Sequence, residues 1–202
     1  MTIDTKDMLN SILSSISRID YVRPGSIPNI ELYMDQVTTF MEKELSSTKR
    51  FPEDKILTKT MINNYAKNNL LPPPVKKKYS KEHVLVLIFI YYFKNILSIK
   101  DIETLLAPIT EKYFDNDSDF SLTSIYEEVC RTEKGRIDSL QKEVAKAHKT
   151  ATESFTDVPE EDRDYLQLFS FICSLSFDVY VKKLIIEKLI DDLPEPENDK
   201  KK

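Results

Sequence analysis

The apolar positions of this chain follow helical spacing over most of its length. In residues 1–17 they recur every three or four positions, which predicts a short amphipathic helix. Pro24 and Gly25 interrupt this pattern. Asn29 is then placed to cap a helix from Ile30 to about Leu45, which carries one broad apolar face. With the patterns described below, this spacing predicts an all-α fold.

The stretch from Thr58 to Tyr79 is the most informative part of the chain. Thr58 can cap a helix whose inward positions include Ile62 and Tyr65. Three consecutive prolines follow and must end this helix, and Asn69 suits a left-handed terminator. The outer side of the helix then presents the polar residues Lys59, Asn63, Asn64 and Lys67.

Three lysines separate the prolines from the next helix. Lys76, Lys77 and Lys78 lead into Tyr79, and Ser80 can cap a helix that is apolar on most of its circumference. A further helix opens at Ser98 and is expected to end before Pro108. The order is therefore helix, turn, basic hairpin or wing, helix.

The composition changes after Pro108. We predict an N-terminal amphipathic segment at 1–26, a helix-turn-helix domain at 27–108, an acidic linker at 109–120, a helical region at 121–193 and a disordered tail at 194–202. The helical region contains a polar helix up to about Lys149, in which Gly135 is a weak point, and a final helix from about Glu161 to Leu193.

The final helix is more apolar than one packing partner requires. This predicts a homodimer formed by the C-terminal helices, with an interface that includes Phe169, Ile172, Tyr180 and Leu184. The alternative is that apolar residues of the preceding helix fold back and cover this surface within a monomer. Those residues are Ile125, Val129, Ile137 and Leu140.

Charge is distributed unevenly along the chain. Between Lys43 and Lys81 ten basic residues stand against three acidic ones, a local charge of +7 that leaves −12 for the rest of a chain whose net charge is −5. Such asymmetry is typical of a local anion-binding face on an acidic body. A solvated lysine surface is the alternative.

Several classes of function find no support in the sequence. The two glycines are too far apart for a phosphate-binding loop, and neither histidine lies near a cysteine, so we expect no catalytic residues, no metal, no cofactor and no enzymatic activity. His83 is expected to be a partly buried helix residue, and Cys130 and Cys173 reduced core thiols. The longest apolar run has ten residues, too short to span a membrane, which with the absence of a signal peptide predicts a cytoplasmic protein.

The region from about Leu57 to Leu106 resembles the MerR type of winged helix-turn-helix domain. The resemblance rests on Thr58, the run Ile62 to Tyr65, Asn69 to Pro72, the basic stretch ending in Tyr79, and the helix opened by Ser98. It implies a helix that enters the major groove and a wing ending at Lys76 to Tyr79. It also implies a pair of side chains, one aromatic and one basic, that contacts phosphate. The chain also looks like uncharacterised bacterial proteins that share the block from Ile27 to Gln36.

Together, these features predict a DNA-binding transcriptional regulator that acts on double-stranded DNA. The expected DNA-binding residues are Lys59, Asn63, Asn64, Lys67, Lys76, Lys77, Lys78 and Tyr79. The MerR family usually has arginine at the position of Asn63, whereas asparagine can pair with adenine in the major groove. A small-molecule effector of unknown identity is possible. The alternative function is a helical protein-interaction adaptor that keeps the fold without reading DNA.

Overall fold

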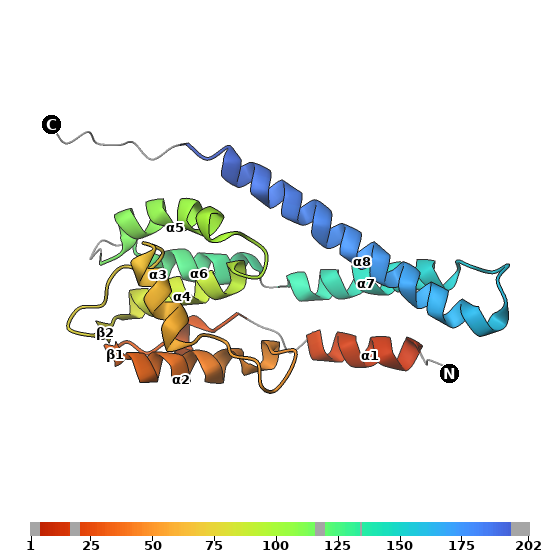
Figure 1. The fold of residues 1–202 in the computed structure, drawn as a ribbon, viewed down its shortest axis with the longest axis horizontal. Coiled ribbons are helices and arrows are strands. Elements are labelled where there is room, and N and C mark those ends of the chain that lie inside the picture. The colour runs from red at the N-terminus through yellow and green to blue at the C-terminus, as the bar shows by residue number, and fades with distance from the viewer. Residues whose placement is uncertain (1–4, 17–20, 116–119, 134, 195–202) are drawn as a thin grey trace. The chain divides into compact units, whose positions relative to one another are not determined.

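The computed structural model describes residues 5–16, 21–115, 120–133 and 135–194, and the chain divides into two compact units (Figure 1). The hairpin unit comprises Tyr21–Thr132 with Ile186–Lys202, and the three-helix unit comprises Met1–Asp20 with Glu133–Ile185. The described residues are mostly helical, as predicted, with one small two-stranded sheet. Residues 116–119 of the predicted acidic linker and 195–202 of the predicted tail lie outside the described part.

The hairpin unit is built around the helix α4, Lys81–Phe93. Every side chain from His83 to Tyr91 is buried, because this helix is apolar on nearly its whole circumference and is surrounded by other elements. These elements are α2 (Met34–Leu45), α3 (Lys59–Lys67), α5 (Ile99–Tyr113), α6 (Leu122–Glu133), and the strands β1 (Leu32–Tyr33) and β2 (Lys78–Tyr79). Short 3₁₀ helices occupy Pro24–Ser26 and Ser46–Thr48.

The start of α2 differs from the prediction. The helix begins at Met34, not at Ile30, and Asn29 does not cap it. Residues Leu32 and Tyr33 instead form β1, which pairs antiparallel with β2 in the register Leu32 to Tyr79 and Tyr33 to Lys78. The backbone N–H of Tyr33 donates to Gln36 Oε1 at 2.8 Å and so closes the first turn of α2. A strand partner 47 positions away in the sequence overrides the local helical signal.

The predicted caps of the central helices are confirmed. Thr58 Oγ1 accepts the backbone N–H of Met61 at 3.2 Å, and α3 then runs to Lys67. Ser98 Oγ accepts the backbone N–H of Asp101, whose carboxylate accepts the N–H of Ser98 in return. These reciprocal bonds satisfy amides that have no partner inside the helix.

Removal of the α3 cap should destabilise the fold measurably. We expect Thr58→Ala to lower the free energy of unfolding by about 1 kcal/mol, because the N–H of Met61 loses its acceptor. Urea unfolding measures this change. Thr60→Ala removes a hydroxyl from an exposed position of the same helix and serves as the control; an equal effect of both substitutions would show that the cap bond contributes nothing.

The helix α5 continues through Pro108 to Tyr113, so the prediction that it ends before this proline is wrong. Ile102 and Leu106 are buried before the proline, and Ile109 and Tyr113 pack against the same core after it. The Thr110 hydroxyl also donates to the Leu106 and Ala107 carbonyls. Burial on both sides of the proline outweighs the one backbone hydrogen bond that its missing N–H removes.

The polar helix predicted from Ser121 to Lys149 is two helices, separated at Gly135. Gly135 has φ +87°, a left-handed conformation that glycine adopts readily, and α7 (Arg136–Thr152) begins after it. The first helix, α6, belongs to the hairpin unit. Its Tyr126 is fully buried and donates its hydroxyl to the Val22 carbonyl at 2.6 Å. The compact hairpin unit therefore continues beyond Pro108 to Thr132.

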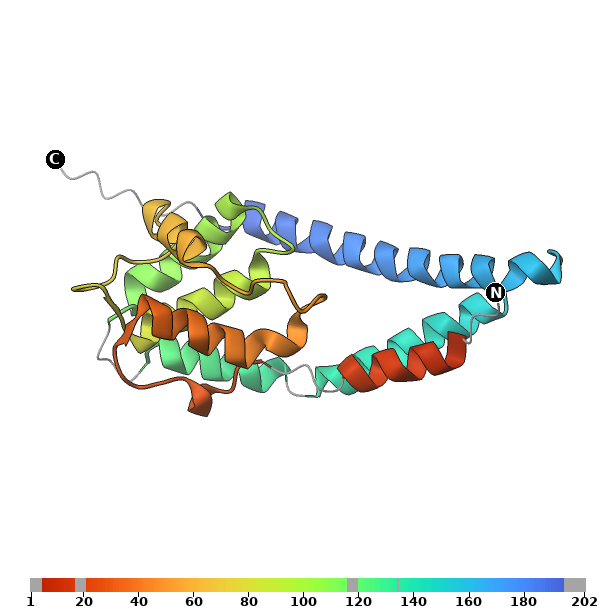
Figure 2. The same cartoon turned by 60° about the horizontal axis from the view of Figure 1, so that its bottom comes forward.

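The three-helix unit contains α1 (Thr5–Ile16), α7 and the part of α8 (Glu160–Asp191) up to Ile185. Leu9 of α1, Ala151 of α7 and Phe171 of α8 form its small core. The helices α1 and α7 lie side by side in both views, and Gln141 Nε2 donates to the Leu13 carbonyl at 3.0 Å (Figure 2). Cys173 of α8 is exposed, so the prediction of a core thiol is wrong at this position, while Cys130 is half-buried.

Candidate nucleic-acid interface

The outer face of α3 gathers four of the predicted DNA-binding residues. Ile62 and Tyr65 are buried in the hairpin-unit core, which fixes the rotation of the helix about its own axis. Residues three and four positions apart share a helix face. The exposed positions on the opposite side are Lys59, Asn63, Asn64 and Lys67, as the sequence predicts.

A left-handed residue ends α3 and turns the chain towards the hairpin. Asn69 has φ +57°, and the backbone N–H of Leu70 donates to the Tyr65 carbonyl at 2.9 Å. This turn places Leu70 and Leu71 in the core, where both are almost fully buried. The predicted role of Asn69 as the terminator of α3 is confirmed. The burial of Leu70 and Leu71 fixes the position at which the proline segment begins.

The three lysines lie on a tight hairpin. The backbone N–H of Lys78 donates to the Val75 carbonyl at 2.9 Å, and Lys76 and Lys77 between them have φ +50° and +65°. Positive φ at both central positions is the geometry of a type I′ turn, which matches the twist of paired strands. Lys76 and Lys77 are exposed at the tip.

The base of the hairpin is less available than predicted. Lys78 Nζ lies 2.9 Å from Glu31 Oε2, and this contact raises the pKa of Lys78. Lys59 is likewise paired with Asp35. The Tyr79 ring is only 3% exposed, and burial raises its pKa. Tyr79 is therefore a packing residue of β2, and we correct its assignment as a DNA contact.

Three lysines, one on α3 and two at the hairpin tip, carry a charge that no ion pair of the described residues neutralises. Among the described residues, no acidic side chain lies within ion-pair distance of Lys67, Lys76 or Lys77. With Asn63 and Asn64 they form what we call the basic face: Asn63, Asn64, Lys67, Lys76 and Lys77. It combines amide groups that can read base edges with ammonium groups that can contact phosphate.

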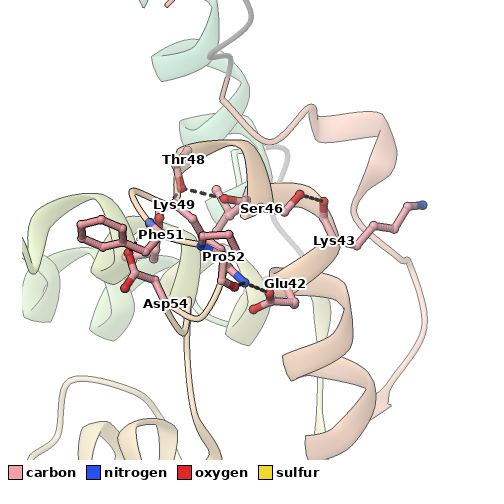
Figure 3. A network of polar contacts seen from close by, with 10 residues as sticks. Glu42, Lys43, Ser46, Thr48, Lys49, Phe51, Pro52 and Asp54 are labelled. Carbon is pink, nitrogen blue, oxygen red and sulfur yellow. Dashed lines mark hydrogen bonds and ion pairs between the residues drawn. The ribbon is translucent and has the colours of Figure 1, made fainter. Parts of the chain in front are cut away.

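The loop between α2 and α3 is held by a polar network (Figure 3). The Lys49 ammonium pairs with Glu42 and lowers the pKa of that carboxyl, while Asp54 Oδ2 accepts the backbone N–H of Phe51 at 2.9 Å. Lys94, the residue that follows the last turn of α4, donates to the Ile56 carbonyl at 2.8 Å, and burial lowers the pKa of Lys94. These contacts, which the sequence does not reveal, fix where α3 begins.

A protein-family model matches residues 22–129, more than half of the chain. The chain belongs to the family described as Domain of unknown function (DUF1836). The matched DUF1836 region contains α2, α3, the hairpin, α4 and α5, and ends inside α6. No curated protein and no solved structure matches the chain.

The other predicted site residues lie outside the DUF1836 region. Phe169, Ile172 and Tyr180 of α8 are each more than half exposed, and Leu184 is 38% exposed. Val129, one of the residues predicted to fold back and cover α8, packs against the hairpin-unit core instead.

Within the described residues, no group of three His, Cys, Asp or Glu side chains is placed to bind a metal. None of the described helices is both long and apolar enough to cross a membrane.

Proposed function

We propose that this DUF1836 protein binds double-stranded DNA through the basic face and regulates transcription. The observation that carries the proposal is the exposure of Asn63 and Asn64 on α3, next along the chain to a tight turn that presents Lys76 and Lys77. An α-helix fits the major groove, and asparagine can pair with adenine there. The lysines supply contacts to phosphate that hold the helix in register.

The order of elements supports the further proposal of a MerR-like winged helix-turn-helix. The helices α2 and α3 contact each other and are followed by the hairpin, α4 and α5. In this interpretation α3 reads the bases and the hairpin is the wing. The loop between α2 and α3 is longer than the resemblance implies, and its polar network keeps α3 in a fixed place (Figure 3).

The partner that we propose besides DNA is a second copy of the chain, bound through the exposed face of α8. Phe169, Ile172 and Tyr180 each expose more than half of their surface. Leu184, the fourth residue of the predicted interface, follows Tyr180 by four positions and is 38% exposed. The successive spacings of three, eight and four positions place these large apolar side chains along one side of the helix. A twofold dimer would let two basic faces meet DNA half-sites about 34 Å apart.

A salt titration tests DNA binding. Each phosphate that a lysine neutralises adds about −0.9 to the slope of log affinity against log salt concentration. We expect Lys76→Ala with Lys77→Ala to flatten this slope by about two units and to leave the sequence preference unchanged. Fluorescence anisotropy on genomic fragments, including the DNA upstream of its own gene, measures the slope.

Lys142→Ala with Lys146→Ala is the matched control, because it removes two exposed lysines from α7 in the other unit. This control should leave the slope unchanged. Equal slopes for the hairpin variant and the wild type would contradict the role of the hairpin. Absence of salt-dependent binding to any fragment would contradict the DNA proposal and favour the protein-interaction adaptor.

A further inference from the structure

The small sheet of the hairpin unit has one buried face and one exposed face. Residues that pair directly across an antiparallel sheet point to the same side of it. Leu32 of β1 pairs with Tyr79 of β2, and both face the core, since they are 5% and 3% exposed. Successive residues of a strand point to opposite faces, so the next pair, Tyr33 and Lys78, faces outward. Tyr33 is 55% exposed.

Val75 continues this exposed face on the other side of Lys78. It forms an antiparallel bridge with Lys78 across the hairpin and is 61% exposed. Tyr33, Lys78 and Val75 therefore stand side by side in one row, which we call the outer row. Neighbouring strands lie about 4.8 Å apart, so the row is about 10 Å wide. Neither Tyr33 nor Val75 is part of the hairpin-unit core, so core packing does not account for them.

The residues next to the outer row carry positive charge in a strained backbone. Lys76 and Lys77 directly follow Val75 and have φ +50° and +65°. Glycine and asparagine adopt this conformation more readily than lysine does, and type I′ turns favour them. Residues held in such conformations are typical of functional sites. Two lysines at these positions thus indicate that positive charge is needed beside the outer row.

The carboxylates near the outer row are each paired with a lysine. Glu31 Oε2 lies 2.9 Å from Lys78 Nζ, and Asp35, two positions after Tyr33, pairs with Lys59. The pKa of Lys78 is raised first by Glu31 and further by Tyr33, which agrees with a phenol beside this ammonium group. The middle of the row is therefore neutral, and its charged edge is positive.

This combination fits the backbone of a nucleic acid better than it fits a protein. A phosphate oxygen accepts hydrogen bonds from tyrosine hydroxyls as well as from lysine. The sugars between the phosphates present carbon atoms that an apolar side chain can contact. An apolar protein surface on the outer row would leave the two tip lysines without a counter-charge, whereas phosphates supply it.

We propose that the outer row contacts the sugar–phosphate backbone of DNA, with the Tyr33 hydroxyl donating to a phosphate oxygen and Val75 packed against an adjacent deoxyribose. This inference rests on the DNA binding proposed above and adds a contact beyond the basic face. Tyr33 precedes both the basic segment that begins at Lys43 and the MerR-like region that begins near Leu57, so neither signal indicates it.

Tyr33→Phe tests the hydroxyl while keeping the ring. We expect the dissociation constant for DNA to rise about tenfold, the effect of one hydrogen bond to a charged acceptor. The slope of log affinity against log salt concentration should stay unchanged, because a neutral donor releases no counterion. The sequence preference should also stay unchanged. Tyr113→Phe is the matched control, because Tyr113 is a half-buried tyrosine of α5 in the same unit, and it should bind as the wild type does.

Val75→Glu tests the other end of the outer row. A carboxylate at this exposed position would face the phosphates and offset one lysine, so we expect weaker binding and a salt slope flattened by about one unit. Ile96→Glu places the same charge on a 43% exposed residue between α4 and α5, and should leave both quantities unchanged. Wild-type binding by V75E would overturn the placement of the row on DNA.

A duplex in which single phosphates are replaced by uncharged methylphosphonates identifies the contact. If Tyr33 donates to one phosphate, the losses caused by Y33F and by that replacement should not add, whereas they should add at every other position. Additive losses at every position, with DNA still bound, would overturn this inference, retain the DNA proposal and leave the outer row to a protein partner. Absence of salt-dependent binding to any duplex would overturn both.

Discussion

Replacement of Ile172 by glutamate in α8 is expected to convert a dimer into a monomer at micromolar concentration. Ile172 is 52% exposed, between Phe169 and Tyr180 on the same side of the helix. In the proposed dimer the new carboxylate would be buried in an apolar contact, and an unpaired buried charge costs several kcal/mol. Loss of about 3 kcal/mol would weaken association more than 100-fold.

Light scattering and sedimentation of the full chain measure this change. Ser174→Glu is the matched control, because residue 174 is also exposed on α8 but lies about 200° around the helix from residue 172. We expect this control to remain dimeric. A wild-type protein that is monomeric at micromolar concentration, or an I172E protein that still dimerises, would contradict a dimer through this face.

The charges along α8 further predict that the two helices run antiparallel. Residues 160–164 hold four acidic side chains and one arginine, whereas Lys182 and Lys183 follow near the other end. Parallel helices would bring the two acidic segments together, and antiparallel helices bring each beside the lysines of the partner copy. Opposite charges at such flanking positions set helix orientation.

A charge exchange tests the orientation. We expect K182E with K183E to weaken the dimer, and E161K with D162K to weaken it as well. The variant with all four substitutions should recover the wild-type association, because each end again meets the opposite charge. If each double variant weakens the dimer but the variant with all four substitutions does not recover association, the two helices run parallel.

The parts of the fold that the sequence predicts well are those specified by neighbouring residues. Thr58 and Ser98 cap their helices through bonds to residues three positions ahead, so a short window contains the whole signal. The left-handed Asn69 is also a local property. The long apolar pattern of α4 requires burial on all sides and correctly places it at the centre of a unit.

The missed features depend on residues distant in sequence. The strand β1 exists because Leu32 meets Tyr79, and nothing near Leu32 indicates a partner there. The pattern of α6 resembles that of a separate polar helix until Tyr126 is found bonded to Val22, 104 positions away. Local propensity is a weak guide wherever tertiary packing decides the outcome.

The candidate site shows the same division. Helical spacing was sufficient to place Asn63, Asn64 and Lys67 on one exposed face. It could not show that Glu31 pairs with Lys78, because the two are 47 residues apart. A lysine count therefore overstates the charge of this surface, because Lys59 and Lys78 are paired with carboxylates. Among the described residues, Lys67 and the two lysines at the hairpin tip remain outside any ion pair.

Alanine at both Asn63 and Asn64 is expected to abolish most of the preference for the target sequence while leaving non-specific binding intact. A bidentate contact from asparagine to adenine contributes about 1 to 3 kcal/mol of discrimination. Loss of one such contact would lower the ratio of specific to non-specific affinity by about fivefold to 150-fold. Phosphate contacts from Lys76 and Lys77 would remain, so the salt dependence should stay unchanged.

Selection from random DNA by the wild type gives the target, and competition with random duplex then gives the specificity ratio of each variant. Asn95→Ala is the matched control, since Asn95 is also an exposed asparagine of the hairpin unit but lies beyond the end of α4. It should select the same sequence as the wild type. If the double variant also selects that sequence with equal affinity, α3 is not the reading element, and the hairpin or the N-terminal segment must make the base contacts instead.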